Sequence, residues 1–191
     1  MPNQAIKLAL YGHLALINSR RRALGDRAIK VPQDSGRRSS CCAQEGKHMK
    51  IIYRAYTDLD APALVRLMAQ LGYEHSETTL ASNVRAVRQQ GGEVFVAEVA
   101  GNVLGCVSAI IDVRLAEGVK GEIVSLVVSE EARGHGIGKG LVLEAQQWLA
   151  GKVTVLRVRV NALREQSHLF YESLGYRKDK TQVVLTKRIE H

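Results

Sequence analysis

The sequence predicts an α+β fold, in which a central mixed, mostly antiparallel sheet is flanked by about four helices. Three observations indicate this fold. Segments with strand-like alternation and segments with helical spacing of apolar residues succeed one another between residues 50 and 188. The turn Ala100-Gly101-Asn102 joins two strand-like segments directly, which favours an antiparallel hairpin. A glycine-rich segment, from Arg133 to Gly140, leads from a strand-like segment into a helical one.

The first predicted element is a strand at residues 50–55. Asp58 is a suitable N-cap for the helix that follows, because its carboxylate can accept hydrogen bonds from the first unpaired amides. That helix extends to Gly72, since apolar residues recur in it at helical spacing: Leu64, Leu67, Met68 and Leu71. A second, more polar helix occupies residues 79–90 and ends at a pair of glycines.

Three strands are expected next, at residues 93–99, 103–113 and 121–129. The glycine-rich segment then begins a helix that runs from about residue 137 to residue 150. The apolar alternation of residues 153–160 predicts a strand with one buried face. A helix over residues 164–174 ends at Gly175, a frequent C-terminal stop, and residues 181–188 are expected to form the last strand.

The glycine-rich segment predicts a phosphate-binding turn. The first amides of a helix have no acceptor within the helix, and they lie at the positive end of the helix dipole, where phosphates bind. A nucleotide P-loop needs Ser or Thr after its Gly-Lys pair, but Gly140 follows Lys139 here. A dinucleotide fingerprint needs glycines at its first, third and sixth positions, which this segment does not provide.

The remaining pattern, Arg133-Gly134-His135-Gly136-Ile137-Gly138, resembles the pyrophosphate loop of the GNAT superfamily of acetyl-CoA-dependent N-acetyltransferases. Asn161 and the segment Phe170-Tyr171-Glu172-Ser173-Leu174-Gly175-Tyr176 resemble a second element of that family. The order of predicted elements, β-α-α-β-β-β-α-β-α-β, is also the GNAT order. The resemblance therefore implies a GNAT acetyltransferase domain over residues 49–191, long enough for one hydrophobic core.

The resemblance also implies acetyl-CoA as the acetyl donor. The backbone amides of residues 134–139 would hold the pyrophosphate, and Arg133 or Lys139 would add positive charge. Backbone groups of the preceding strand would pair with the pantetheine arm and bind the carbonyl oxygen. The expected cofactor-binding residues are Leu126, Val127, Val128, Arg133, Gly134, His135, Gly136, Ile137, Gly138, Lys139 and Asn161.

Two residues are candidates for catalysis. The resemblance places Tyr171 beside the thioester sulfur, where it would act as a general acid toward the leaving thiolate. Glu122 is the candidate base: period-two spacing puts it on one strand face with Val124, Leu126 and Val128, and a partly apolar cleft would raise the pKa of its carboxyl group. Ordered water is the alternative base, and a solvated glutamate at a strand end is the alternative environment.

The expected activity is transfer of an acetyl group to a primary amine of a small molecule, by direct attack in a ternary complex. The alternatives are an acetyltransferase acting on protein N-termini or lysines, and a non-catalytic acyl-CoA-binding sensor. In the GNAT fold the acceptor site is shaped by residues 72–79 and by strand-end loops such as residues 114–120. Three glutamates in these segments could attract a cationic amine: Glu74, Glu77 and Glu117.

Composition argues against several other classes of protein. The net charge is +8, but residues 49–191 hold 18 Lys and Arg against 16 Asp and Glu, so we expect no nucleic-acid partner. Three cysteines give neither a disulfide framework nor a metal-binding spacing. No apolar run reaches the length of a membrane span. A cytoplasmic enzyme without metal is expected, and relatives of this fold commonly form homodimers.

Residues 1–48 form a basic N-terminal extension, with nine Lys and Arg against three Asp and Glu. They lack the order of a signal peptide, because the arginines follow the apolar run, whereas their content of arginine and their few acidic residues leave a transit peptide as an alternative. Met49 looks like the natural start of the domain, and Gln44-Glu45-Gly46 can be encoded by a purine-rich ribosome-binding sequence. The extension is therefore expected to be translated upstream sequence that packs weakly.

Overall fold

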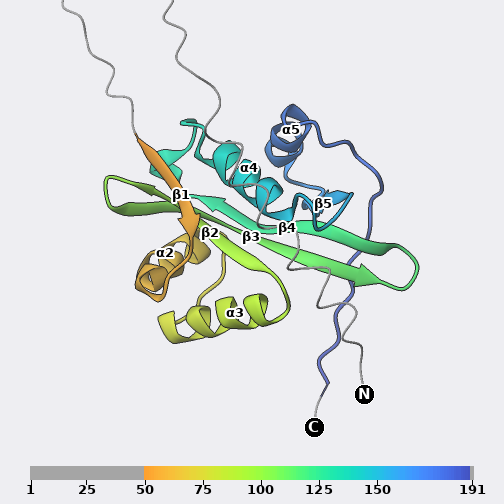
Figure 1. The fold of residues 1–191 in the computed structure, drawn as a ribbon, viewed down its shortest axis with the longest axis horizontal. Coiled ribbons are helices and arrows are strands. Elements are labelled where there is room, and N and C mark those ends of the chain that lie inside the picture. The colour runs from red at the N-terminus through yellow and green to blue at the C-terminus, as the bar shows by residue number, and fades with distance from the viewer. Residues whose placement is uncertain (1–49, 190–191) are drawn as a thin grey trace, which may run out of the picture. The chain divides into compact units, whose positions relative to one another are not determined.

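The computed structural model describes residues 50–189, which form one mixed sheet with helices on both faces (Figure 1). The expectations for residues 1–48 and for Met49 concern residues outside this range. In chain order the elements are β1 (Ile51–Ala55), the 3₁₀ helix η1 (Asp58–Asp60), α2 (Ala61–Gln70), α3 (Glu77–Gln89), β2 (Glu93–Val99), β3 (Asn102–Arg114), β4 (Gly118–Val128), the 3₁₀ helix η2 (Glu130–Ala132), α4 (Ile137–Leu149), β5 (Leu156–Val158) and α5 (Glu165–Ser173).

The sheet has five strands in the order β1-β2-β3-β4-β5. The first three pairs of neighbours are antiparallel, and β4 pairs with β5 in parallel, which confirms the predicted mixed, mostly antiparallel sheet. Helices α2 and α3 cover one face, and α4 and α5 lie over the other (Figure 1). No helix among residues 50–189 is long and apolar enough to cross a bilayer.

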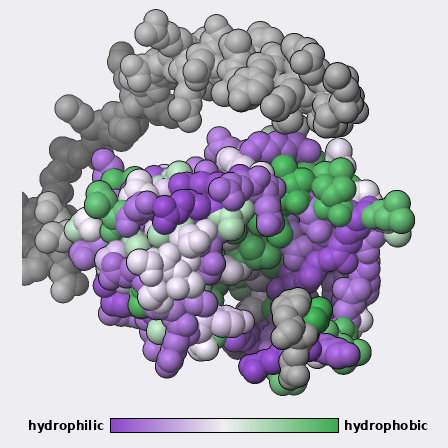
Figure 2. Space-filling model, turned by 90° about the horizontal axis from the view of Figure 1, so that it is seen from below, coloured by the Kyte–Doolittle hydropathy of each residue, from purple (hydrophilic) through white to green (hydrophobic). Residues whose placement is uncertain are grey.

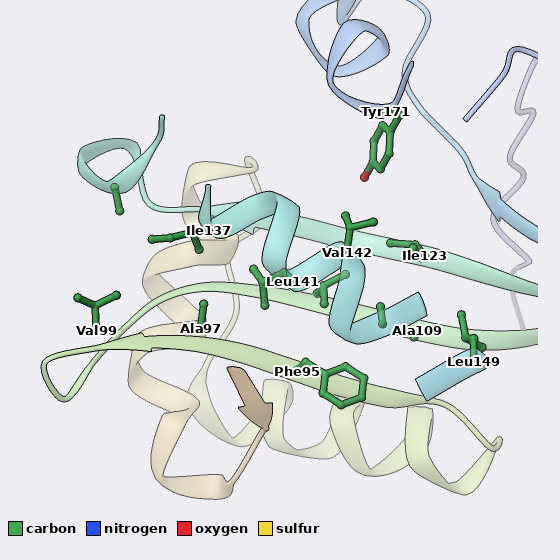
Figure 3. Close-up of a cluster of buried hydrophobic side chains, with 13 residues drawn as sticks. Phe95, Ala97, Val99, Ala109, Ile123, Ile137, Leu141, Val142, Leu149 and Tyr171 are labelled. Carbon is green, nitrogen blue, oxygen red and sulfur yellow. The ribbon is translucent and has the colours of Figure 1, made fainter. Parts of the chain in front are cut away.

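Each face of the sheet has its own hydrophobic core. The core beneath α4 joins inward-facing strand residues to one stripe of that helix, which includes Ile137, Leu141 and Val142 (Figure 3). Tyr171 on α5 belongs to the same core. The core beneath α2 and α3 contains Leu64 and Leu67, so the helical spacing recognised in the sequence is the buried stripe of α2.

A β-bulge in β4 changes which side chains share a face. Cys106 of β3 pairs with Val127, but Ser108 pairs with Val124, so β4 has one extra residue in this interval. Ser125 lies there with φ +53°, in the left-handed region that residues other than glycine rarely adopt. Ile123 consequently packs under α4, whereas Val127 packs under α2 and α3.

The prediction that Glu122, Val124, Leu126 and Val128 share one face was therefore wrong. Leu126 and Val128 pack against the core beneath α4, on the same side as Ile123. Strict alternation then leaves Glu122 and Val124 on the opposite face, toward α2 and α3. A period-two pattern cannot reveal an inserted residue, because the bulge changes pairing with a distant strand and not the local sequence.

Helix starts differ slightly from the prediction. Asp58 is not an N-cap, because it is the first residue of η1, and Thr57 occupies the cap position in a capping box with Asp60. The Asp60 carboxylate accepts hydrogen bonds from the Thr57 amide at 2.8 Å and from the Arg54 guanidinium at 2.7 and 2.8 Å. Helix α3 begins at Glu77, two residues earlier than expected, with Ser76 as its N-cap.

The predicted last strand was also wrong. Residues 181–188 have no regular secondary structure, and Val183, Val184 and Leu185 are between 80% and 89% exposed. Lys180 forms an ion pair with Glu117 at 2.8 Å, which ties the start of this segment to the β3–β4 hairpin. The β3–β4 hairpin projects to the right in Figure 1, and Figure 2 shows hydrophobic residues at the surface on that side. An alternating pattern forms a strand only when a sheet edge pairs with it.

Candidate active site

The glycine-rich turn adopts the backbone that the sequence predicts for an anion-binding helix start. Gly134 and Gly136 have φ +81° and +79°, and Gly136 is the N-cap of α4 without any capping side chain. The first helical hydrogen bond in this turn runs from the Gly140 amide to the Gly136 carbonyl at 3.0 Å. The preceding amides of α4 have no acceptor within the helix and remain available to a ligand.

The side chains of the turn contribute less than its backbone. His135 and Lys139 are exposed. Arg133 Nε donates to the Val128 carbonyl at 3.3 Å, and its Nη2 lies 3.5 Å from a Glu130 carboxylate oxygen. Arg133 therefore connects the turn with the end of β4 and with Glu130.

A cleft opens where β4 and β5 part. The two strands are paired only from Gly121 with Leu156 to Ile123 with Val158. Beyond Ile123, the bulge at Ser125 turns β4 while the chain after Val158 runs on toward α5. The backbone of β4 at Ser125 and Leu126 consequently has no partner in β5, although β3 still pairs with the other edge of β4.

This cleft has a volume of about 250 Å³. Its walls come from β4, from the end of β5, from α5 and from the segment between α2 and α3. The lining residues are Leu71, Tyr73, Ile123, Val124, Ser125, Leu126, Val158, Arg159, Val160, Asn161, Arg164, Ser167 and Tyr171. Three residues that the sequence singled out thus meet here, namely Leu126, Asn161 and Tyr171.

Tyr171 places a phenol in the cleft. Its side chain is 8% exposed, and its ring packs edge-on against Phe170 and Tyr176 at centroid distances of 5.0 and 5.6 Å. Figure 3 shows the ring descending from α5 with its hydroxyl toward the sheet. Burial raises the pKa of Tyr171 to about 12, so the hydroxyl is protonated at neutral pH and can donate a proton.

Asn161 organises the loop between β5 and α5. Its Oδ1 accepts a hydrogen bond from the Leu163 amide at 2.9 Å, and its carbonyl accepts one from the Arg164 amide at 3.0 Å. The His168 Nε2 also lies 3.1 Å from that carbonyl. The amide nitrogen of the Asn161 side chain stays available for a ligand, since an Asn side chain carries two donors besides its oxygen.

Glu122 lies outside the lining of the cleft and is paired with two arginines. Its Oε2 accepts hydrogen bonds from Arg157 Nη2 at 2.6 Å and from Arg159 Nη2 at 3.2 Å, and its Oε1 lies 3.0 Å from Arg159 Nε. The whole Glu122 residue is 3% exposed. The expected partly apolar environment was therefore wrong. The sequence placed both arginines on the strand predicted over residues 153–160, but it did not show that parallel pairing would bring Arg157 opposite Glu122.

Other features of the site had little or no signal in the sequence. Ser125 carries the bulge, yet a serine within an apolar run has no particular meaning. Arg159 and Arg164 line the cleft, but the sequence placed Arg159 only within the strand predicted over residues 153–160 and Arg164 at the start of the following helix, without a role for either. Tyr73 belongs to the segment between α2 and α3, which the resemblance had already connected with the acceptor.

Comparisons with known proteins agree with this geometry. Residues 90–178 match the family described as "Acetyltransferase (GNAT) domain", a range that contains the glycine-rich turn and Tyr171. A glucosamine 6-phosphate N-acetyltransferase of Trypanosoma brucei brucei is 28% identical over 109 residues, which are 54% of this chain and 73% of that protein.

Two solved structures illustrate the structural likeness. A Trypanosoma brucei acetyltransferase has a TM-score of 0.63 at 25% identity, over 72% of this chain and 100% of that chain. An aminoglycoside N-acetyltransferase in complex with CoA has a TM-score of 0.66 at 17% identity, over 75% of this chain and 99% of that chain; that likeness concerns the fold alone. With the matching sequence, the five-stranded sheet and the cleft between β4 and β5, the chain belongs to the GNAT superfamily and is an acyltransferase of the GNAT type.

Proposed function

We propose that this protein transfers an acetyl group from acetyl-CoA to a primary amine of a small molecule, within a ternary complex. The observation that carries the proposal is the cleft between β4 and β5. It joins an unpaired stretch of backbone at Ser125 and Leu126 to the Tyr171 hydroxyl, on the side of the sheet where the glycine-rich turn begins α4. The named N-acetyltransferase relative and the CoA complex of a protein with the same fold support acetyl-CoA as the donor.

The residues present fit this donor. Acetyl-CoA would supply an activated thioester carbonyl. The free amides at the start of α4 suit its pyrophosphate, and the unpaired edge of β4 suits the amide groups of its pantetheine arm, in the manner of an added strand. An amide of the bulge at Ser125 and Leu126 would stabilise negative charge on the carbonyl oxygen. The side chain of Asn161 has donors left to hold the arm in place.

Proton transfers fall to Tyr171 and to water in this proposal. The protonated phenol of Tyr171 would donate to the leaving thiolate. The ammonium group of the acceptor would lose its proton to ordered water in the cleft, because both oxygens of Glu122 are already paired with guanidinium groups, Oε2 by hydrogen bonds and Oε1 in an ion pair. Glu122 then acts as a positioning residue that holds Arg157 and Arg159 where the two strands part.

The test is calorimetric titration of acetyl-CoA into the full chain and into glycine variants. Gly136→Ala places a side chain at φ +79°, which disfavours the turn and should weaken binding at least about tenfold. Gly151→Ala is the matched control, since Gly151 has φ +81° and equally open surroundings but lies after the C-terminal end of α4.

Saturable binding that Gly136→Ala weakens and Gly151→Ala preserves supports the site, and acetyl transfer to a small amine then supports the activity. Binding without transfer to any amine favours the sensor, and transfer only to peptides favours a protein acetyltransferase. Equal weakening by both variants contradicts the assignment of the turn.

A further inference from the structure

The cleft is lined by two arginines and by no carboxylate. We propose that the acceptor amine carries an anionic group, either a phosphate or a carboxylate, which Arg159 and Arg164 bind. This inference rests on the proposed transfer to an amine, and it names the chemical class of the acceptor. It also reverses the expectation that glutamates would attract a cationic amine.

Arg159 lies on the side of the sheet opposite to the glycine-rich turn. Val158 and Val160 pack against the core beneath α4, so alternation turns the side chain of Arg159 toward the face of α2 and α3. Its ion pair with Glu122, which faces the same way, agrees with this orientation. A donor held at the start of α4 therefore enters the cleft from one face, and Arg159 meets an acceptor that enters from the other.

The segment between α2 and α3 forms the opposite wall on that face. Leu71 and Tyr73 line the cleft there. The Tyr73 ring stacks on His75 with an interplanar angle of 12° and a centroid distance of 6.4 Å. Glu74 and Glu77 are exposed and are not among the lining residues, so this wall offers the acceptor an aromatic surface instead of negative charge.

The ion-pair cluster that connects Arg159, at the cleft, with the β3–β4 hairpin has an excess of positive charge. Within residues 50–189 it contains five cationic side chains, Arg114, Lys120, Arg157, Arg159 and Lys180, against three carboxylates, Asp112, Glu117 and Glu122. Glu117, the remaining candidate for attracting a cation, is already bound by Lys120, Arg157 and Lys180. The field at this end of the cleft therefore favours an anion.

Both lining arginines retain donors for a ligand. The side chain of Arg159 is 51% exposed, and its Nη1 has no hydrogen-bond partner in the described part of the chain. Arg164 is exposed and has no ion-pair partner among residues 50–189. A guanidinium group presents its N–H donors in a planar fork that matches the oxygens of phosphate and carboxylate.

The experiment compares matched amines as acceptors for the full chain with acetyl-CoA. One pair is glucosamine 6-phosphate with glucosamine, and the other is L-phenylalanine with its amide; spermidine serves as a polycation. We expect the anionic member of one pair to have a kcat/KM at least about tenfold higher, because hydrogen bonds between charged groups stabilise its complex with the arginines. The pair that shows the preference distinguishes phosphate from carboxylate.

Variants assign the preference to the arginines. Arg159→Gln and Arg164→Gln should each reduce the preference at least about fivefold, mainly through KM, whereas Arg177→Gln on the exposed chain after α5 should leave it unchanged. Arg159→Gln also removes the ion pair with Glu122 and could unfold the protein. In that case Arg164→Gln, which removes no such pair, still tests the proposal. The proposal is overturned if glucosamine, phenylalanine amide or spermidine, which lack an anionic group, are equally good acceptors. It is also overturned if the preference for the anionic acceptor survives in both variants.

Direct binding separates this inference from the proposed activity. Glucosamine 6-phosphate and L-phenylalanine are titrated calorimetrically into the protein in the presence of CoA. Binding of either that the two variants weaken supports the anion site even if no amine is acetylated, and then only the proposed activity fails. If neither compound binds, the anion site is overturned.

Discussion

Nη2 of Arg157 donates a hydrogen bond to Oε2 of Glu122 at 2.6 Å, between two residues that are register partners in the parallel pair of β5 and β4. One residue further along, the pairing ends and the cleft begins. The side chains of Glu122 and Arg157 are only 4% and 16% exposed. This buried ion pair therefore fastens the two strands at the point from which they diverge.

Arg157→Met should destabilise the protein, because it removes one of the two guanidinium groups that compensate the buried charge of Glu122. We expect the free energy of unfolding to fall by about 2 kcal/mol, which lies within the range of about 1.5–3 kcal/mol for the loss of a hydrogen bond to a charged group. Urea unfolding followed by circular dichroism measures it. Arg114→Met is the control, since Arg114 is 38% exposed and pairs with Asp112 nearer the surface; its effect should stay below about 1 kcal/mol. Equal losses would show that burial of the pair is unimportant.

Tyr171→Phe should slow acetyl transfer by roughly 10²-fold and leave acetyl-CoA affinity nearly unchanged, because it removes only the proposed proton donor. Since burial raises the pKa of Tyr171 to about 12, ionisation of this phenol should produce no loss of kcat below roughly pH 11. Steady-state kinetics from pH 6 to pH 10 and calorimetry test both statements. Tyr176→Phe, which loses a hydrogen bond from Gln146, is the control. Unchanged kcat in Tyr171→Phe would remove this residue from the mechanism.

Ser125→Val should lower both stability and activity. A β-branched residue fits poorly at φ +53°, so the free energy of unfolding should fall by about 1–2 kcal/mol. A distorted bulge would also move the unpaired backbone of the cleft, and kcat/KM for acetyl-CoA should fall about tenfold.

Glycine variants give the matching control for this bulge. Ser125→Gly and Ala100→Gly both relieve a positive φ, but Ala100 lies in the β2–β3 turn, away from the cleft. Both should preserve or slightly raise the thermal midpoint. Only Ser125→Gly should change kcat/KM, and a similar change in Ala100→Gly would contradict a special role of the bulge.

Acid should weaken the ion-pair cluster at the β3–β4 hairpin. Hydrogen bonds from Lys180 and Lys120 lower the pKa of Glu117 to about 2. A carboxyl group whose pKa is lower in the folded protein stabilises it above the unfolded pKa of about 4.3, and this contribution is lost as the pH falls toward 2. Lys180→Met should therefore shift the urea midpoint more at pH 6 than at pH 3. Lys178→Met, on the same exposed segment, should shift it little at either pH, and a pH-independent effect of Lys180→Met would refute the linkage.

Much of the fold could be predicted from the sequence because its signals are local. Residues 93–99 form a strand with the predicted bounds, and the stripe of Leu64 and Leu67 on α2 is buried as its spacing indicated. The glycine-rich turn could be predicted equally well, because glycine adopts the positive φ angles of Gly134 and Gly136 without steric cost. Asn161 and Tyr171 were found through a motif and do lie together in the cleft.

The tertiary structure decided what depends on distant partners. The bulge at Ser125 exists only in the pairing of β4 with β3, and it moved Glu122 to the face opposite Leu126. The parallel register of β4 and β5 decided that Glu122 meets arginines instead of an apolar wall. The alternation of residues 181–188 did not produce a strand, because no edge of the sheet pairs with them. Local sequence thus determined the turn and the helical stripes, whereas charge pairing, strand register and the lining of the cleft depend on chain segments that only folding brings together.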